Sequence, residues 1–473
     1  MTSAPTTVFL TGGTGAWGKA TLRALRARGD RFHVIALARP GRRNEAILRR
    51  FAGPGFEIAW GDLTDAALIA ACVARADVVL HLGALVSPAA DSQPERTNAV
   101  NVGSIRNIVA AVRALPDPSR VGVVGVGSIA ESGDRRPPVH WGRIGDPVRV
   151  SPGDVYGQSK VAAERELVES GLPRWAWLRQ TGIVHPAMIR IRDPIMTHPT
   201  LDGVLEWASD DDSARLLANI AEGAPDEFWG DVWHVGGGQA WRLTNWEFLQ
   251  ATAGALGIGD IRRWFDRNWF ATRNFHGFWF SDSDRLEALV HFREDTVAAA
   301  FRRAGAGLPP GVRQAAQAVS PIVKRTVIRP LIERPRGTLG AIRRGDEREI
   351  ETFFGSLEAW RAIGDWSTFV PPEPSRVPSR LDHGYDESRA PDTWDAALLA
   401  GAADFRGGRL VSPDAPRGAV RTPLEWACAE GHRFTASPWL VLRAGHWCPE
   451  CVRDTANIEH QAERNRFLAQ VVR

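Results

Sequence analysis

A tyrosine and a lysine stand four residues apart in the segment DVYGQSKVAAE, at Tyr156 and Lys160. The chain has 473 residues but only 2 tyrosines, and arginine supplies nearly all of its other positive charges. Residues four apart on a helix share one face, and an ammonium group near a phenol lowers the phenol pKa. Tyr156 is therefore a candidate for proton exchange with an alcohol or a carbonyl. The alternative is an ordinary helix with an aromatic residue and a solvated lysine.

The N-terminal segment TTVFLTGGTGAWGKATLRALRARG has the pattern of an apolar strand, a Gly-rich turn and a helix that Gly29 can end. Glycines let the backbone approach a pyrophosphate, and the first N–H groups of the helix form an anion site. An ordinary tight turn is the alternative interpretation. The cofactor-binding residues expected in this turn are Gly12, Thr14, Gly15, Ala16, Trp17 and Gly18.

Arginines follow the second expected strand, FHVIALAR at 32–39. An NAD-binding domain carries an acidic residue at this point for the ribose 2′-hydroxyl, whereas this chain has Arg39, with Arg42 and Arg43 close behind. Because guanidinium groups pair with phosphate, the sequence predicts NADP rather than NAD, unless these arginines are simply solvated. Strands that alternate with helical segments further predict an α/β fold with a Rossmann-type, doubly wound parallel sheet.

Residues 1 to about 305 resemble the extended short-chain dehydrogenase/reductase family, which includes nucleotide-sugar epimerases and dehydratases. Four motifs agree in order and spacing: TGGTGAWG at 11–18, GDL at 61–63, NAVNVGSIRNIVAA at 98–111 and YGQSK at 156–160. The resemblance implies that Ser128 is the catalytic serine, holding the substrate oxygen beside Tyr156. A turn or N-cap serine is the alternative. The other cofactor contacts that the resemblance implies are Asp62, Leu63, Gly83, Ala84, Tyr156 and Lys160.

Departures from the family pattern favour one reaction over others. The family's sugar dehydratases carry an Asp-Glu pair where this chain has Ile129 and Ala130, and its epimerases usually have the acidic residue that is missing after strand two. We therefore expect an NADP(H)-dependent oxidoreductase that transfers hydride between nicotinamide and a carbonyl or secondary alcohol, with Tyr156 as general acid/base. Two alternatives stay open: an NAD(P)-dependent epimerase acting on a nucleotide sugar, and an NADP-sensing regulatory protein that recruits a partner.

Residues 187–310 are rich in tryptophan and phenylalanine. These side chains suit a pocket for an apolar or aromatic substrate, with Asn274 and His276 as polar contacts, but the favoured interpretation is the core of a small α/β cap. The basic stretch 302–344 suits nucleic acid, an anionic lipid surface or a partner; we favour packing against the chain's own acidic surface. The formal net charge of +3 gives no nucleic-acid signature.

The C-terminal segment holds three of the 4 cysteines. Cys428, His432, Cys448 and Cys451 give Cys-x3-His, a fifteen-residue gap and Cys-x-x-Cys, the four ligands of a tetrahedral zinc site. The segment resembles a bacterial zinc-ribbon or treble-clef module, and four protein ligands imply a structural role. A redox dithiol is the alternative function, and His446 could replace His432 as a ligand.

The length of 473 residues predicts about two or three domains. We expect a homo-oligomer acting on a small molecule in the cytoplasm, because metal-binding thiolates and the unpaired Cys72 suit a reducing compartment and no signal peptide or membrane span is evident. The predicted parts are an NADP-binding Rossmann domain (1–186), an interleaved substrate cap (187–310), a basic, Pro-rich, helical extension (311–419) and a zinc module (420–473).

Overall fold

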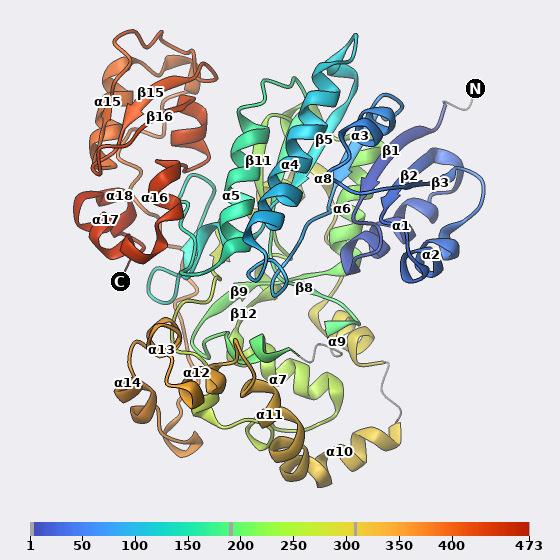
Figure 1. The fold of residues 1–473 in the computed structure, drawn as a ribbon, viewed down its shortest axis with the longest axis vertical. Helices are drawn as coiled ribbons and strands as arrows, with labels where there is room; N and C mark the ends of the chain where they lie inside the picture. Colours follow the sequence, from blue (N-terminus) through green and yellow to red (C-terminus); the bar gives the residue numbers. More distant parts are fainter. Residues whose placement is uncertain (1–3, 189–192, 307–309, 473) are drawn as a thin grey trace.

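The computed structural model describes residues 4–188, 193–306 and 310–472. Its centre is a seven-stranded parallel sheet with the order β11-β7-β5-β4-β1-β2-β3 (Figure 1). This topology confirms the predicted Rossmann-type fold. The strands are β1 (Thr6–Thr11), β2 (Phe32–Ala38), β3 (Phe56–Trp60), β4 (Val78–His81), β5 (Gly122–Val126), β7 (Trp175–Gln180) and β11 (Asp231–Val235).

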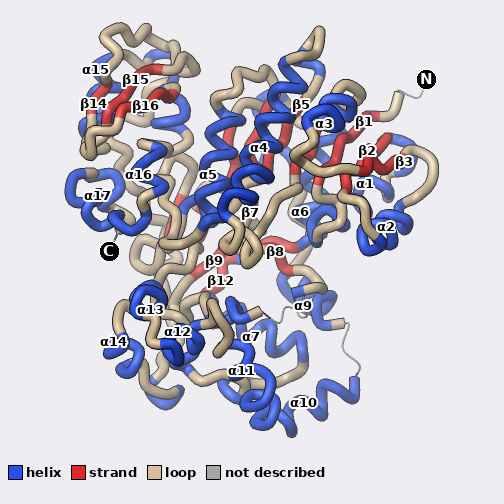
Figure 2. The backbone as a smooth tube through the Cα atoms, viewed as in Figure 1, coloured by secondary structure: helices blue, strands red, loops and turns tan. Residues whose placement is uncertain are grey.

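Helices cover both faces of the sheet, which explains why its strands are almost continuously apolar (Figure 2). On one face, α4 packs between α3 and α5; on the other, α1 packs against α6. Cys72 of α3 is buried in the core. The helices are α1 (Ala16–Arg26), α2 (Arg42–Leu48), α3 (Ala66–Val73), α4 (Pro94–Arg113), α5 (Val155–Val168), α6 (Asp210–Gly223) and α8 (Ser283–Val290).

A second lobe lies below the sheet in Figure 1 and combines cap residues with the helices that follow them. Most cap aromatics are core residues here, because Trp264, Phe265 and Trp269 pack with Ile332 and Leu339 of the extension. The elements are β6 (Trp141–Gly142), β8 (Ile183–Val184), β9 (Val204–Glu206), β10 (Ala208–Ser209), β12 (Arg242–Thr244), β13 (Trp279–Phe280), α7 (Asn245–Leu256), α9 (Val297–Gly305), α10 (Pro310–Val323), α11 (Arg329–Ile332), α12 (Thr338–Arg344), α13 (Glu347–Phe354) and α14 (Leu357–Ala362).

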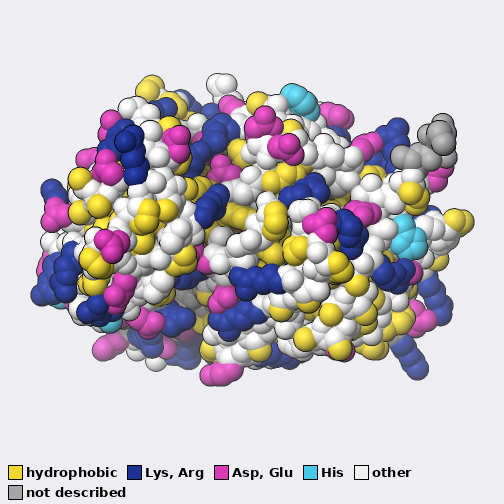
Figure 3. Space-filling view, turned by 90° about the horizontal axis from the view of Figure 1, so that it is seen from above, with side chains coloured by type: hydrophobic (Ala, Val, Ile, Leu, Met, Phe, Trp, Pro, Cys, Tyr) yellow, Lys and Arg dark blue, Asp and Glu magenta, His cyan; other side chains and the backbone are white. Residues whose placement is uncertain are grey.

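The basic stretch pairs with acidic groups of the same chain, as we favoured from the sequence. Arg303 pairs with Asp295, Lys324 with Asp266 and Arg336 with Asp91. Residues 307–309 of this stretch lie outside the described residues. Positive and negative side chains are also interspersed on the face shown in Figure 3.

The C-terminal module folds back beside α5, far along the chain from the residues it touches (Figure 1). Its hydrophobic residues, among them Trp426 and Trp439, form one continuous cluster with those of the Rossmann domain. Within the described residues, no helix combines the length and apolarity needed to cross a bilayer. Two elements of the expected extension, α15 (Ala396–Phe405) and β14 (Arg409–Leu410), pack with the elements of 420–473, so the C-terminal module is defined as residues 396–472. Its other elements are β15 (Leu424–Ala427), β16 (Arg433–Ala436), α16 (Pro449–Arg453), α17 (Ile458–Arg464) and α18 (Arg466–Ala469).

Candidate active site and metal centre

The structure brings Ser128, Tyr156 and Lys160 together at the start of α5. Asp154 caps this helix, since its Oδ1 accepts a hydrogen bond from the Gly157 N–H at 2.8 Å. The Lys160 Nζ lies 5.9 Å from the centre of the Tyr156 ring and donates to the Val126 carbonyl at 2.7 Å. The Ser128 side chain interacts with Tyr156 in the direction that lowers the pKa of the phenol. A buried cation and two hydroxyl groups therefore share one site.

Burial is the main cause of the pKa shifts of Tyr156 and Lys160. It raises the pKa of Tyr156 well above its usual value, and the carboxyls of Glu131 and Asp154 add to the increase while Ser128 opposes it. The expectation that Lys160 lowers the pKa of Tyr156 is therefore wrong for this structure, because the cost of a buried phenolate outweighs the neighbouring charge. Burial also lowers the pKa of Lys160 to about 8, against an opposing effect of Glu131. A phenol that keeps its proton is suited to act as an acid.

Ser128 also caps the short 3₁₀ helix Ile129–Ser132. Its Oγ accepts from the Ala130 N–H at 3.2 Å, while the Ser128 N–H donates to Glu131 Oε1 at 2.7 Å. Glu131 is fully buried, and a Cβ on Gly127 would lie 2.3 Å from its Oε1. Sequence reasoning missed Glu131, although the Ser-x-x-Glu pattern of a capping box is present.

The turn between β1 and α1 has the shape that a dinucleotide requires. Gly12 has a φ of +73°, and a Cβ there would lie 2.8 Å from the Gly83 nitrogen. A Cβ on Gly18 would lie 2.1 Å from the Gly12 carbonyl oxygen, so the helix packs directly on the turn. Gly15 is the exposed N-cap, and the first turn of α1, which includes Ala16 and Trp17, holds no acidic residue. The helix leaves its first N–H groups free for an anion.

The other expected cofactor residues lie beside this turn, at the carboxyl ends of neighbouring strands. Leu63 packs on Gly83, whose Cβ, if present, would lie 2.8 Å from Leu63 Cδ1. Asp62 Oδ1 accepts from the backbone N–H and hydroxyl of Thr64. Arg39 is exposed directly after β2 and forms no ion pair within the described residues. Thr14 and Ala84 are half-buried in the loops after β1 and β4. Open α/β sheets bind ligands at this edge.

A cleft of about 1140 Å³ opens beside Tyr156. Most of its lining residues are polar or charged, and His276 Nδ1 lies 4.0 Å from Asp154 Oδ2. Burial raises the pKa of Asp154 to about 6 and lowers that of His276 to about 4. Four parts of the chain, from the Rossmann domain to the C-terminal module, contribute to the lining: Arg149 and Tyr156, then Arg273 and His276, then Arg336 and Phe353, then Ile458 and Val471. Asn274 and His276, expected from the sequence as polar contacts of a pocket, are among the lining residues. The walls from the extension and the C-terminal module were not expected.

The four expected metal ligands converge in the C-terminal module. The His432 Nδ1 lies 3.5 Å from the sulfur of each of the three cysteines, and the sulfurs of Cys428 and Cys451 are 3.7 Å apart. Around a tetrahedral zinc ion with its usual bond lengths, a histidine nitrogen lies about 3.6 Å from a cysteine sulfur, and two cysteine sulfurs lie about 3.75 Å apart. The cluster therefore fits a metal ion of this size. His446 lies elsewhere, with its Nε2 3.0 Å from Glu164 Oε1.

Comparison with known proteins agrees with the fold. Residues 8–171 match the model of the NAD dependent epimerase/dehydratase family. Comparison with curated proteins gave no significant match.

Solved structures show the same fold at low identity. A dTDP-glucose 4,6-dehydratase from Bacillus anthracis, in complex with NAD, is 14% identical, with a TM-score of 0.51, over 64% of this chain and 96% of that chain. A dTDP-glucose 4,6-dehydratase variant from Streptomyces venezuelae is 21% identical, with a TM-score of 0.51, over 63% and 95%. A UDP-glucose-4-epimerase from Stenotrophomonas maltophila, with bound NAD, is 18% identical, with a TM-score of 0.50, over 66% and 99%.

Proposed function

We propose that the protein is an NADP(H)-dependent oxidoreductase that reduces a carbonyl group or oxidises a secondary alcohol. The observation that carries this proposal is the convergence of Ser128, Tyr156 and Lys160 between a glycine turn suited to a dinucleotide and a large cleft. A regulatory NADP sensor has no need of a proton donor at this position, so the convergence favours an enzyme.

In the reductive direction, Tyr156 donates a proton to the carbonyl oxygen and Ser128 holds that oxygen by a hydrogen bond. The high pKa of Tyr156 keeps the proton available until the oxygen becomes basic. Lys160 places a positive charge beside the phenol and is the residue that would contact the nicotinamide ribose. The nicotinamide supplies the hydride when it is bound.

We further propose NADP as the preferred coenzyme. Arg39 follows β2 directly, and Arg42 and Arg43 begin α2, so three exposed guanidinium groups lie near the carboxyl end of that strand. A 2′-phosphate would be held there by charge-assisted hydrogen bonds. No carboxylate occupies the position that would favour a free 2′-hydroxyl.

The cleft favours a polar substrate over the apolar one considered from the aromatic content. Five arginines line it beside several carboxylates, and most of the cap aromatics are buried elsewhere. The same polarity supports a second candidate function, an NAD(P)-dependent epimerase acting on a nucleotide sugar. For the metal centre we propose structural zinc, held by Cys428, His432, Cys448 and Cys451.

Coenzyme absorbance separates these functions. The purified protein is mixed with NADPH or NADH and a panel of polar carbonyl compounds, and separately with nucleotide sugars in the absence of added coenzyme. The proposed reductase consumes NADPH with at least one carbonyl compound. An epimerase would convert a nucleotide sugar with no net coenzyme change. Coenzyme binding without any turnover would support a sensor and overturn the proposal.

A further inference from the structure

The C-terminal module contacts the outer face of α5, the helix that carries Tyr156 and Lys160. The Gln158 side chain donates to the Arg453 carbonyl at 3.1 Å, and Arg165 donates to the Thr435 carbonyl. Just beyond the helix, the Glu169 carboxylate accepts from the Ser437 hydroxyl at 2.6 Å. These contacts span the whole length of α5, so the module holds the helix from end to end.

A buried group of charges joins the module to the catalytic side of the same helix. Arg179 forms two hydrogen bonds to the Glu164 carboxylate, at 2.7 and 2.9 Å, and donates to the Ala444 carbonyl at 2.9 Å. His446 contacts the same carboxylate at 3.0 Å. Arg179 also lies 3.5 Å from Glu131, which accepts the Ser128 N–H. The side chains of Arg179, Glu164, His446 and Glu131 are all buried.

The contacts on the module side lie close to the metal ligands in the sequence. Ala444 and His446 precede Cys448 by four and two residues, and Arg453 follows Cys451 by two. Three strands of two to four residues are the only sheet of the module among the described residues. A module this small relies on its metal to fix such loops.

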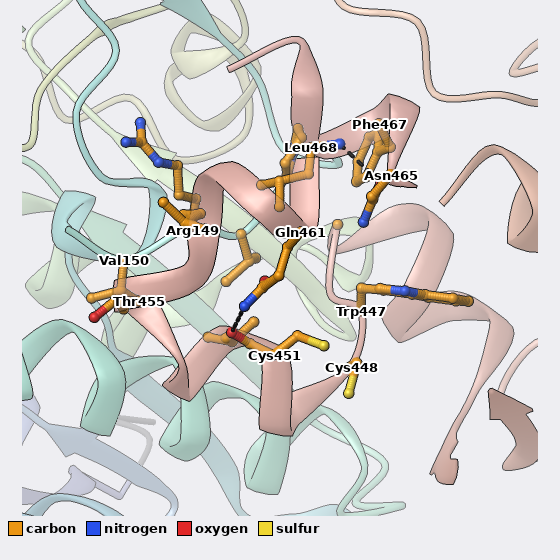
Figure 4. A pocket seen from close by; sticks show the side chains of 15 residues that line it. Arg149, Val150, Trp447, Cys448, Cys451, Thr455, Gln461, Asn465, Phe467 and Leu468 are labelled. Atoms are coloured by element: carbon orange, nitrogen blue, oxygen red, sulfur yellow. Dashed lines mark hydrogen bonds between the residues drawn. The ribbon is translucent and has the colours of Figure 1, made fainter. Parts of the chain in front are cut away.

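The junction between module and Rossmann domain is tightly packed. A cavity of only about 40 Å³ remains there, lined by Arg149 and Val150 on one side and by Trp447, Cys448 and Cys451 on the other (Figure 4). The Val148 N–H donates to the Gly445 carbonyl at 3.2 Å. A change in the position of Cys448 would therefore change the packing at this junction.

We propose that metal binding in the C-terminal module positions the catalytic helix, with His446 and Glu164 as positioning residues, so that metal and NADP(H) binding strengthen each other. The coenzyme half of this coupling rests on the proposed function. Coupling between two sites is reciprocal, and typical values are about 5- to 150-fold.

The test combines hydrogen exchange with coenzyme titration on the full chain. Metal-loaded and chelator-treated protein are compared, with peptides from α5 as the readout and peptides from α6 on the opposite face as the internal control. We expect faster exchange in α5 alone and NADPH affinity lowered about tenfold after metal removal. Added NADPH should slow the loss of zinc to the chelator. Unchanged α5 exchange in protein that has lost its metal would overturn the proposal.

Two matched variants cover the case in which the metal-free chain unfolds. His446→Gln should keep its zinc but show faster α5 exchange and weaker NADPH binding, whereas His460→Gln, an exposed histidine of the same module, should change neither. Equal behaviour of the two variants contradicts a positioning role for His446. If the wild-type protein binds no NADPH, the proposed function fails, while α5 exchange still decides whether the metal positions the helix.

Discussion

The His446 Nε2 lies 3.0 Å from the Oε1 of Glu164, so a residue two positions before a metal ligand touches the helix of Tyr156 and Lys160. From its sequence spacing, His446 was a possible alternative metal ligand. Its contact with a buried carboxylate gives it a different role and leaves His432 as the candidate for the fourth ligand. The metal module and the candidate active site are thus parts of one packed unit.

Metal content distinguishes the two histidines. We expect one zinc per chain in the wild-type protein and in His446→Gln, but less than one in His432→Gln, because only His432 directs a ring nitrogen at the three sulfurs. Elemental analysis of the purified full-length proteins gives the ratio. Full zinc content in His432→Gln, with loss in His446→Gln, would reverse the assignment.

Coenzyme preference depends on the arginine after β2. Arg39→Glu should weaken NADP binding by roughly tenfold or more, since a hydrogen bond to a charged group contributes about 1.5–3 kcal/mol and the new carboxylate repels the 2′-phosphate. NAD affinity should stay the same or improve. Fluorescence titration with both coenzymes measures this, with Arg26→Glu as a control. Equal losses for NADP and NAD would refute the 2′-phosphate assignment.

Glu131 offers a test of the buried charge network. Burial and Glu164 raise its pKa well above the usual value, and its two oxygens accept hydrogen bonds from two buried donors. Glu131→Gln has a single acceptor oxygen, so it should keep one of the hydrogen bonds from Ser128 and Trp177 and cost about 1–3 kcal/mol for the buried donor left unpaired. Glu131→Leu leaves both donors unpaired and should cost about twice as much. Thermal unfolding compares the two variants. A Gln variant as unstable as the Leu variant would contradict the role of Glu131 as the acceptor for these two donors.

Asp154 predicts a pH dependence of stability. Burial raises its pKa from 3.8 to about 6, so between these values the unfolded chain ionises first and the folded protein loses stability as the pH rises. The loss is complete above pH 6 and amounts to at most roughly 3 kcal/mol. Asp154→Asn keeps the helix cap without this cost. Its melting temperature relative to wild type should therefore increase from pH 4.5 to pH 7.5; a constant difference would contradict the raised pKa.

The sequence predicted what short-range spacing determines. The glycine turn, Tyr156 with Lys160, and the Cys-x-x-Cys pair with His432 each depend on local geometry, and each lies where the pattern indicated. The walls of the cleft escaped prediction because Arg336 and Ile458 reach it only through tertiary packing. The prediction of a lowered pKa for Tyr156 was wrong for the same reason, because the burial that raises this pKa is a property of the whole fold.

Turnover by Tyr156→Phe tests the central claim most directly. The variant lacks only the phenolic oxygen, so NADPH affinity should stay within about twofold of wild type while coenzyme-dependent reduction of a carbonyl substrate falls by at least about a hundredfold. Stopped-flow absorbance measures the chemical step, and equilibrium fluorescence measures binding. Rapid reduction by Tyr156→Phe would contradict the assignment of Tyr156 as the acid of a hydride-transfer enzyme.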